Sequence, residues 1–518
     1  MFNLDAKEKY ILDELIGKNS SQLVIPVFQR NYVWGKKDCK RLFNDVLNLL
    51  NDHSREKPHF LGAIVYRFNR FIEHDMIENV LIDGQQRLTT IIILLKALVD
   101  NLKGNESYAD LVSEITEIYL INKFAKREKY KLKLKPNKSD GEIFNYLMSD
   151  SYDRIDKTSN IYQNYIYFSN ELKNLKVDIR DFLSALKRLQ GVSVILGEKD
   201  NPQLIFESLN STGIDLTDVD LIRNYLLMSV DAKSQDEFYE KYWIKLEYLL
   251  KDNFRDFIRD FLTFNNGVVT SGSKNKVYIA FRYFFEKQDP DIENFLEKML
   301  VNAKIYNQLI EPQYDEKTLN EALIDYSKLK MGTTFPFLFG VLRDHHENKI
   351  TSHELVRIIR LLESYVVRRN IVNLAGGGLT QLMASMYKEL ISQYKDLFFE
   401  KPYEYVSSYL MNVKTKAYFP KNEEFIREFK NRDMYHNRNI RYILSKIESY
   451  KNSKEHVDFS NLSIEHVIPQ KINGEWMQDL GINSNDDEIY SIYKDRIGNL
   501  TITAYNSEMS SKSFKNKK

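Results

Sequence analysis

The sequence has few of the residues that build disulfide-linked, turn-rich or membrane-spanning proteins. Its single cysteine, Cys39, excludes an intramolecular disulfide framework and a CxxC zinc site. Only 19 glycines and 10 prolines occur in 518 residues, which favours long helices over a turn-rich all-β fold. No apolar run approaches the roughly 20 residues that span a bilayer, and residues 1–13 resemble no signal peptide. We therefore expect a cytoplasmic protein in a reducing compartment, with no membrane partner.

Excess charge of one sign is also missing. The net charge is +1, so any surface that binds nucleic acid must be local. A chain of 518 residues is too long for one compact core, so we expect two or three domains.

Hydrophobic periodicity predicts an α/β start, a helical middle and a short β-containing end. Strands are predicted at 23–27, 60–66, 78–82, 128–135 and 192–196, and helices at 5–17, 37–51 and 86–102. Between residues 220 and 450 the periodicity is almost entirely helical, and after 462 short strands return. The expected fold class is multidomain, helix-rich α+β, with an N-terminal α/β domain.

Residues 81–90, LIDGQQRLTT, place an Asp-Gly turn between a predicted strand and a predicted helix. Backbone N–H groups at the start of a helix bind anions. Gln85, Gln86 and Arg87 add side-chain donors, Arg87 can fork onto a phosphate, and Asp83 can hold a divalent ion or orient water. Taken alone, such a turn is more often an ordinary turn with a helix N-cap than an anion site.

Gln29 and Arg30 follow another predicted strand and are expected beside Asp83. Parallel strands present their carboxyl ends to one shared crevice, so these residues should meet across about 50 intervening positions. The chain contains no GxxxxGK[ST] segment, which excludes a P-loop.

A second group of polar residues lies near the C-terminus, in residues 464–470, IEHVIPQ, and 496–506. His466 can take a proton from water, and Glu465 can ligate a hard cation such as Mg²⁺ or Mn²⁺. Asn499 begins a second β-prone run, and Asn506 starts a helix and offers an oxygen to the same ion. This pattern predicts a ββα-metal finger. The alternative is a surface Glu–His pair and an ordinary N-cap at Asn506.

Three N-terminal motifs resemble those of the GmrS-type domain, a relative of ParB and sulfiredoxin. They are IPVFQRNYVW at 25–34, DGQQRLTT at 83–90 and IFESLNSTG at 205–213. The resemblance covers roughly residues 5–230 and implies a site that binds and hydrolyses a nucleoside triphosphate (NTP). Its expected residues are Gln29, Arg30, Asp83, Gly84, Gln85, Gln86 and Arg87, with Asp83 catalytic.

The C-terminal motifs resemble the GmrD-type HNH-like nuclease domain. The resemblance implies that His466 is the general base and that Glu465 and Asn506 are metal ligands. Asn499 would orient the loop around His466. The sequence ends at Lys518, inside the helix that the resemblance implies for the finger. Either the finger is short at its C-terminus or its end is missing, and this bears on the stability and activity of the nuclease. Lys512 and Lys515 are the first candidates for phosphate contacts.

Together the motifs resemble fused GmrSD modification-dependent (type IV) restriction endonucleases. The expected domains are 1–230, GmrS-type; 231–440, a helical spacer; and 441–518, GmrD-type. The implied function is NTP-regulated, metal-dependent cleavage of modified foreign phage DNA in bacterial defence, with double-stranded DNA and NTP as partners. The sequence is also compatible with a homo-oligomer. Two alternatives stay open: a nucleotide-sensing, ParB-like DNA-binding protein with an inactive finger, and a toxin-like abortive-infection nuclease.

Two further charged patterns are interpreted as solvated faces. Lys129, Lys131, Lys133 and Lys135 alternate with apolar residues along the strand predicted at 128–135. In the spacer, an ion-paired helix face is predicted for Glu363, Tyr365, Arg368 and Arg369.

Overall fold

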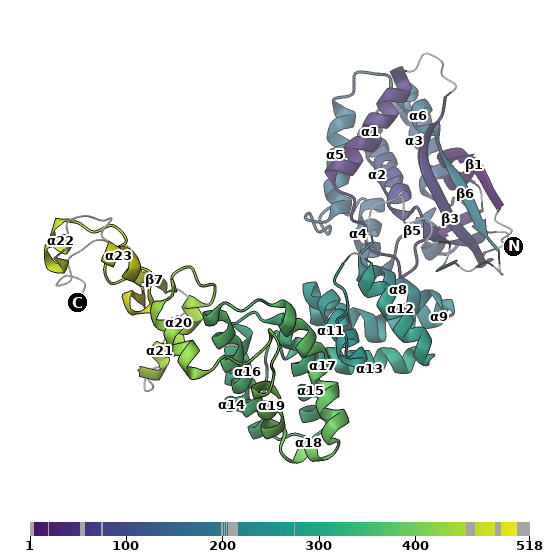
Figure 1. Ribbon diagram of the computed structural model, residues 1–518. Coiled ribbons are helices and arrows are strands. Elements are labelled where there is room, and N and C mark those ends of the chain that lie inside the picture. Colours follow the sequence, from purple (N-terminus) through teal and green to yellow (C-terminus); the bar gives the residue numbers. More distant parts are fainter. Residues whose placement is uncertain are drawn as a thin grey trace. The chain divides into compact units, whose positions relative to one another are not determined.

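The computed structural model describes most of the chain, in two compact units, Met1–Ile244 and Lys245–Lys518 (Figure 1). The described residues are 5–18, 20–51, 57–73, 76–197, 200, 202–203, 205, 216–273, 275–451, 462–481 and 488–504. Asn506, Lys512, Lys515 and the segment 206–215 lie outside them. None of the helices in these ranges is long and apolar enough to cross a membrane.

Within the described part of the first unit, six strands form one mixed sheet in the order β1-β6-β3-β4-β2-β5. The strands are β1 (Asp5–Tyr10), β2 (Ser21–Val24), β3 (His59–Phe71), β4 (Ile77–Asp83), β5 (Leu134–Lys135) and β6 (Leu189–Leu196). β1 with β6 and β3 with β4 are antiparallel, whereas β3 with β6, β4 with β2, and β2 with β5 are parallel. The strands predicted near 23, 60, 78 and 192 are therefore confirmed.

Helices α1 (Lys36–Asn51), α2 (Gln85–Leu102) and α5 (Asn160–Lys173) lie on one face of this sheet (Figure 1). The remaining helices in the described part of the unit are η1 (Ile11–Ile16), η2 (Glu106–Tyr108), α3 (Ala109–Glu114), η3 (Ile115–Leu120), η4 (Glu128–Tyr130), α4 (Lys138–Met148), α6 (Ile179–Lys187), α8 (Asp218–Met228), α9 (Ala232–Phe238) and η6 (Tyr239–Trp243). α2 is almost completely buried, so its apolar run from Ile91 to Leu95 belongs to the core. This burial fixes the start of α2 against the sheet.

Two local predictions are wrong, and in both cases long-range contacts override the local pattern. Residues 5–17 form β1 and the π-helix η1, because backbone pairing with β6 outweighs the helical periodicity. In the segment 128–135 only Leu134–Lys135 is a strand. Lys133 is buried there, its Nζ donates to the carbonyl of Lys18 at 3.0 Å, and burial lowers its pKa to about 8.

The second unit is helical up to residue 451, as predicted. Its helices there are α10 (Ile244–Leu250), η7 (Lys251–Asn253), α11 (Phe254–Asn266), α12 (Lys276–Gln288), α13 (Ile292–Asn307), α14 (Lys317–Ser327), η8 (Gly332–Thr334), α15 (Phe335–His346), α16 (Ser352–Val372), α17 (Gly377–Tyr394), α18 (Leu397–Glu400), α19 (Pro402–Met411), α20 (Asn422–Asn431) and α21 (Ile440–Lys451). Aromatic side chains fill the interior, with Phe257 against Tyr306 and Phe264 against Phe339, each at a centroid separation of 5.3 Å.

The interpretation of the α16 motif as a solvated face is wrong for Tyr365 and Arg369, which are buried. The hydroxyl of Tyr365 donates to the carbonyl of Ala417. Arg369 Nη1 donates to the carbonyls of Lys416 at 3.1 Å and Tyr418 at 3.2 Å. Both residues therefore anchor the segment that leads into α20.

A two-stranded sheet follows residue 462. β7 (Ser463–His466) and β8 (Leu500–Thr503) are antiparallel, with Ser463 opposite Thr503 and His466 opposite Leu500. Between them lie α22 (Gly474–Leu480), α23 (Glu488–Tyr493) and η9 (Ile497–Asn499). The two short strands predicted after residue 462 are confirmed, and the helix predicted from Asn506 lies outside the described residues.

Candidate functional site

The parallel pairing of β2 with β4 brings the first two motifs together. The chain leaving β2 carries Gln29 and Arg30, and β4 ends at Asp83. Gln29 Nε2 donates to the carbonyl of Ile82 at 2.8 Å, and Gln85 Nε2 donates to the carbonyl of Arg30 at 3.3 Å. The expected meeting of these segments, and the topology that explains it, are confirmed.

Gly84 forms the turn into α2 in a conformation that favours glycine. Its φ is +97°, and an added Cβ would lie 3.1 Å from a side-chain carbon of Ile64. Gly84 is the N-cap of α2, and no side chain caps this end of the helix. The N–H groups of the first turn are thus left for an anion or water.

Arg87 is committed to the protein itself. Its Nη1 donates to the carbonyl of Leu61 at 3.0 Å, and its Nη2 pairs with Asp83 Oδ2 at 3.1 Å. It lies against Gly62, whose φ is +104°. Both terminal nitrogens already have partners. Arg87 therefore links α2 to β3, and it is not free to bind a phosphate with both nitrogens as the sequence predicted.

Gln86 is also used internally. Its buried Oε1 accepts from the N–H groups of Val33 at 2.9 Å and Trp34 at 3.2 Å, and its Nε2 donates to the carbonyl of Asn31 at 3.0 Å. A glutamine can complete three such bonds because its amide both donates and accepts. Gln86 therefore fixes the segment that follows Arg30.

Arg30 is the cation of this site that remains available. Its half-buried guanidinium makes no side-chain hydrogen bond or ion pair with any residue that the structure describes. Desolvation lowers its pKa, although the carboxylates of Asp220 and Asp83 oppose that effect. Nearby, the buried Oε1 of Gln85 has no hydrogen-bond partner within the described ranges. Arg30 and the N–H groups at the uncapped end of α2 suit a phosphorylated ligand, whereas the Oε1 of Gln85 can only accept a hydrogen bond.

The helix that follows the third motif, α8, also contributes to this site. Thr217 and Asp220 form a capping box at the start of α8. Arg223 Nη2 pairs with Asp220 Oδ1 at 2.7 Å, and Arg223 Nε donates to the carbonyl of Phe28 at 2.9 Å. The resemblance carried by the third motif continues past residue 213 through Asp220 and Arg223, so the sequence contained this signal. α8 thereby places one carboxylate, that of Asp220, and a second guanidinium, that of Arg223, next to Arg30.

In the second unit, His466 is buried at the end of β7. Its Nε2 lies 3.0 Å from Oδ1 of Asp495, and its ring packs on Tyr435 with the centroids 4.4 Å apart. Since a carboxylate can only accept, a neutral His466 carries its proton on Nε2 and its lone pair on Nδ1. Asp495 thereby sets the tautomer of the predicted general base.

Asn499 fastens the loop that follows His466. Its Oδ1 accepts from the N–H of Ile468 at 2.7 Å, and its Nδ2 donates to the carbonyls of Ile468 at 3.0 Å and Lys494 at 2.8 Å. These bonds join the two segments that carry His466 and Asp495. They support the role of loop organiser expected for Asn499.

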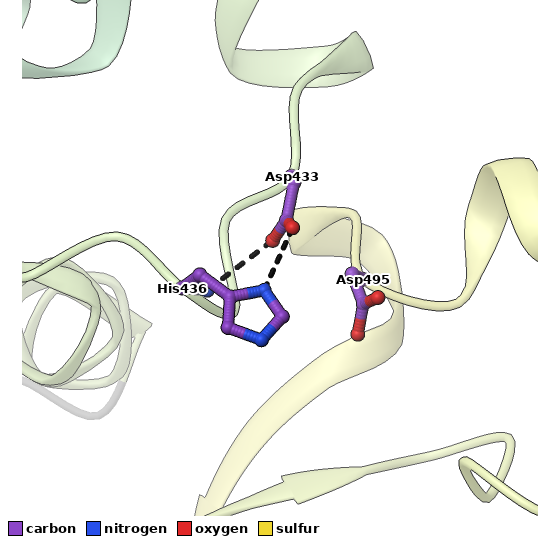
Figure 2. A group of neighbouring side chains, drawn as sticks. All are labelled: Asp433, His436 and Asp495. Atoms are coloured by element: carbon purple, nitrogen blue, oxygen red, sulfur yellow. Dashed lines mark hydrogen bonds and ion pairs between the residues drawn. The ribbon is translucent and has the colours of Figure 1, made fainter.

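Beside His466 lies a group of three possible metal ligands that the sequence analysis did not select: Asp433, His436 and Asp495 (Figure 2). One ligand atom of each lies within 4.8 Å of those of the others. His436 Nδ1 lies 2.7 Å from Asp433 Oδ2, and this contact raises the pKa of His436. The signal in the sequence was a D-x-x-H spacing and an aspartate directly before RIGNLT.

Backbone hydrogen bonds hold this group together across the fold. The carbonyl oxygen of Asp495 accepts from the N–H groups of Met434 at 2.8 Å and Tyr435 at 3.2 Å. The turn that carries Asp433 and His436 is therefore docked directly on Asp495. Two carboxylates and one imidazole form a donor set that fits Mn²⁺ better than Mg²⁺, which prefers oxygen ligands alone.

The other expected ligand pair has a different setting. Glu465 precedes His466 in β7 and is buried. Adjacent residues of a strand face opposite sides, so Glu465 is directed away from the side on which Asp495 meets His466. Asn506, its expected partner, lies outside the described residues.

Comparisons with known proteins cover both ends of the chain. Residues 12–227 match the model for the N-terminal domain of GmrSD restriction endonucleases, and residues 419–518 match that for the C-terminal domain. An uncharacterised protein of Methanocaldococcus jannaschii is 23% identical over 265 residues, which are 46% of this chain and 45% of that protein. The chain thus spans less than half of that relative's length. With both domain models matched in order, the chain belongs to the GmrSD restriction endonuclease family.

Proposed function

We propose that this protein is a metal-dependent DNA endonuclease that cleaves modified foreign DNA under the control of an NTP. The observation that carries the proposal is the contact of His466 with Asp495, beside Asp433 and His436. A buried, oriented histidine next to side chains that could hold a metal ion is an arrangement suited to phosphodiester hydrolysis.

In this proposal His466 takes a proton from the water that attacks the phosphorus. Asp495 keeps the ring in the required tautomer and stabilises the imidazolium that forms, as an aspartate does beside other catalytic histidines. Asn499 holds the His466 loop in place through its three hydrogen bonds. A divalent ion bound by the neighbouring carboxylates would supply charge stabilisation for the phosphate.

The N-terminal site supports regulation by a nucleotide. Arg30 offers a guanidinium that makes no hydrogen bond or ion pair with a described residue, the first turn of α2 offers N–H groups, and Asp83 offers a carboxylate already oriented by Arg87. Arginine and helix N-termini are frequent phosphate ligands. We assign NTP binding to this site, with Asp83 positioning the hydrolytic water.

The test is a cleavage assay on matched modified and unmodified phage DNA, with and without NTP and with Mn²⁺ or Mg²⁺. We expect metal-dependent cleavage of the modified DNA, altered by NTP. Binding without any cleavage in either metal would favour the nucleotide-sensing DNA-binding alternative. Equal cleavage of unmodified DNA would contradict restriction of modified DNA and favour the toxin-like alternative.

A further inference from the structure

A groove of about 720 Å³ lies on the second unit, separate from the His466 site. It is lined by α16, by α19 and by the segment from Phe419 to Asn422 that leads into α20. This volume lies within the range of small-molecule sites and exceeds what one phosphate group requires.

The charged side chains that line the groove are all cations. The lining includes Arg357, Arg360, Arg368 and Lys421, and no aspartate or glutamate. The first two are neutralised from outside the groove, Arg357 by Glu354 and Glu404, and Arg360 by Asp325 and Glu363. Neither Arg368 nor Lys421 pairs with an acid anywhere in the part of the chain that the structure describes. The groove therefore retains positive charge.

Arg368 is held in place by neutral groups only. Its Nη1 donates to the carbonyl of Pro420 at 3.2 Å, its Nη2 to Asn422 Oδ1 at 2.8 Å, and its Nε to Ser364 Oγ at 3.3 Å. Its guanidinium also lies 4.8 Å from the ring centroid of Phe425. Burial lowers its pKa, which reflects the missing counter-charge. Its orientation is fixed, and in contrast to Arg87, which pairs with Asp83, its charge is not neutralised by a carboxylate of the described residues.

Aromatic and apolar side chains lie beside these cations. The guanidinium of Arg357 stacks 3.8 Å from the ring centroid of Tyr403. Phe419 and Met411 complete this wall, and Met411 is 57% exposed. Cations next to flat apolar surfaces are the combination that binds nucleotides, because phosphates meet the charge and bases stack on the rings.

We propose that this groove binds a nucleotide unit of DNA whose base is accessible, with its phosphate at Arg368 and Lys421 and its base against Tyr403 and Phe419. The assignment of DNA as the source of the nucleotide rests on the proposed function. A free NTP shares this chemistry, so the experiment compares the two ligands directly.

The experiment measures the fluorescence anisotropy of a labelled single-stranded oligonucleotide and of labelled ATP. The full chain carries His466→Ala, and EDTA is present, so that cleavage has no influence. The groove variant is Arg368→Gln with Lys421→Gln. The control is Arg427→Gln with Lys430→Gln, which removes the same charge from exposed positions of α20 outside the groove. We expect about a tenfold loss of oligonucleotide affinity in the groove variant and less than a twofold loss in the control. Two lost phosphate contacts should also reduce the log–log salt slope by about 1.4 units.

Lys421→Glu is a second groove variant, chosen because it should not disturb folding. Lys421 is exposed, and its side chain makes no hydrogen bond or ion pair with a described residue. Reversing its charge therefore leaves the hydrogen bonds that hold Arg368 in place unchanged. It should weaken oligonucleotide binding without changing the melting temperature. Unchanged affinity in both variants overturns the proposal, and a loss confined to labelled ATP overturns DNA as the occupant. If wild-type protein cuts no DNA but still binds it through the groove, only the proposed function fails.

Discussion

The guanidinium of Arg87 occupies the space where a side chain on residue 62 would begin. A Cβ on Gly62 would lie 2.3 Å from Arg87 Nη1, and the φ of Gly62 is +104°. The strand β3 therefore depends on glycine at this position, because Arg87 must reach the carbonyl of Leu61. This relationship links the DGQQR motif to a strand more than twenty residues earlier.

Gly62→Ala should destabilise the first unit by at least about 2 kcal/mol, because the substitution adds both backbone strain and a clash. Gly141→Ala is the control, since a Cβ there meets nothing within 4 Å and alanine favours the helix α4. Urea unfolding of both variants gives the comparison. Equal stabilities would show that Arg87 moves aside at little cost.

Arg30→Gln and Arg87→Ala should separate ligand binding from structure. Arg87→Ala leaves the Leu61 carbonyl and Asp83 without their partner and should cost about 1–3 kcal/mol of stability. Arg30→Gln loses no side-chain bond to a described residue, so its stability should stay within about 0.5 kcal/mol. Its NTP affinity should fall about tenfold or more, the value of one charge-assisted hydrogen bond. Normal NTP binding by a folded Arg30→Gln protein would exclude Arg30 as the phosphate ligand.

His466→Ala should lower DNA cleavage by roughly 10²- to 10⁴-fold, the usual contribution of a general base. NTP hydrolysis should be unaffected, because Asp83 and His466 belong to separate units. His353→Ala is a suitable control, since the side chain of His353 is 80% exposed on α16. Cleavage near the wild-type rate in His466→Ala would exclude the histidine as the base.

Metal binding should distinguish the two sets of candidate ligands. Asp433→Asn with His436→Gln removes two members of the group in Figure 2, whereas Glu465→Gln removes the ligand expected from the sequence. If the group around Asp495 holds the ion, the double variant should weaken Mn²⁺ affinity in calorimetry by at least about tenfold, and Glu465→Gln should change it little. The reverse pattern would assign the ion to Glu465.

The buried carboxyl of Asp344 should make the helical unit less stable as the pH rises. Burial raises its pKa from 3.8 to about 6, although hydrogen bonds from the Tyr387 hydroxyl at 2.9 and 2.8 Å oppose the shift. Between about pH 4 and 6 the folded state retains a proton that the unfolded chain has lost. The free energy of unfolding therefore falls as the pH rises through that window. Above pH 6 the total loss is up to about 3 kcal/mol.

Asp344→Asn keeps an acceptor for Tyr387 and removes the charge. Its stability relative to wild type should rise by up to about 3 kcal/mol from pH 4 to pH 7 in denaturant titrations. Asp396→Asn, at an exposed position, should show no such trend. A constant difference between Asp344→Asn and wild type across this range would contradict the raised pKa.

The sequence by itself determined most strands and helices, the order of the motifs and the meeting of Gln29 and Arg30 with Asp83. These features follow from local periodicity and from the rule that parallel strands share one edge. Periodicity failed at residues 5–17 and 128–135, where pairing with β6 and the burial of Lys133 outweighed the local pattern.

Only the tertiary structure decided which polar side chains are available for chemistry. Gln86 and Arg87 are used by backbone groups of residues 31–34 and of Leu61, which leaves Arg30 as the available cation. Asp433 and His436 meet Asp495 because two N–H groups of their turn bind its carbonyl oxygen. Such assignments depend on which backbone groups lie opposite a side chain after folding, and motif spacing carries no information about those partners.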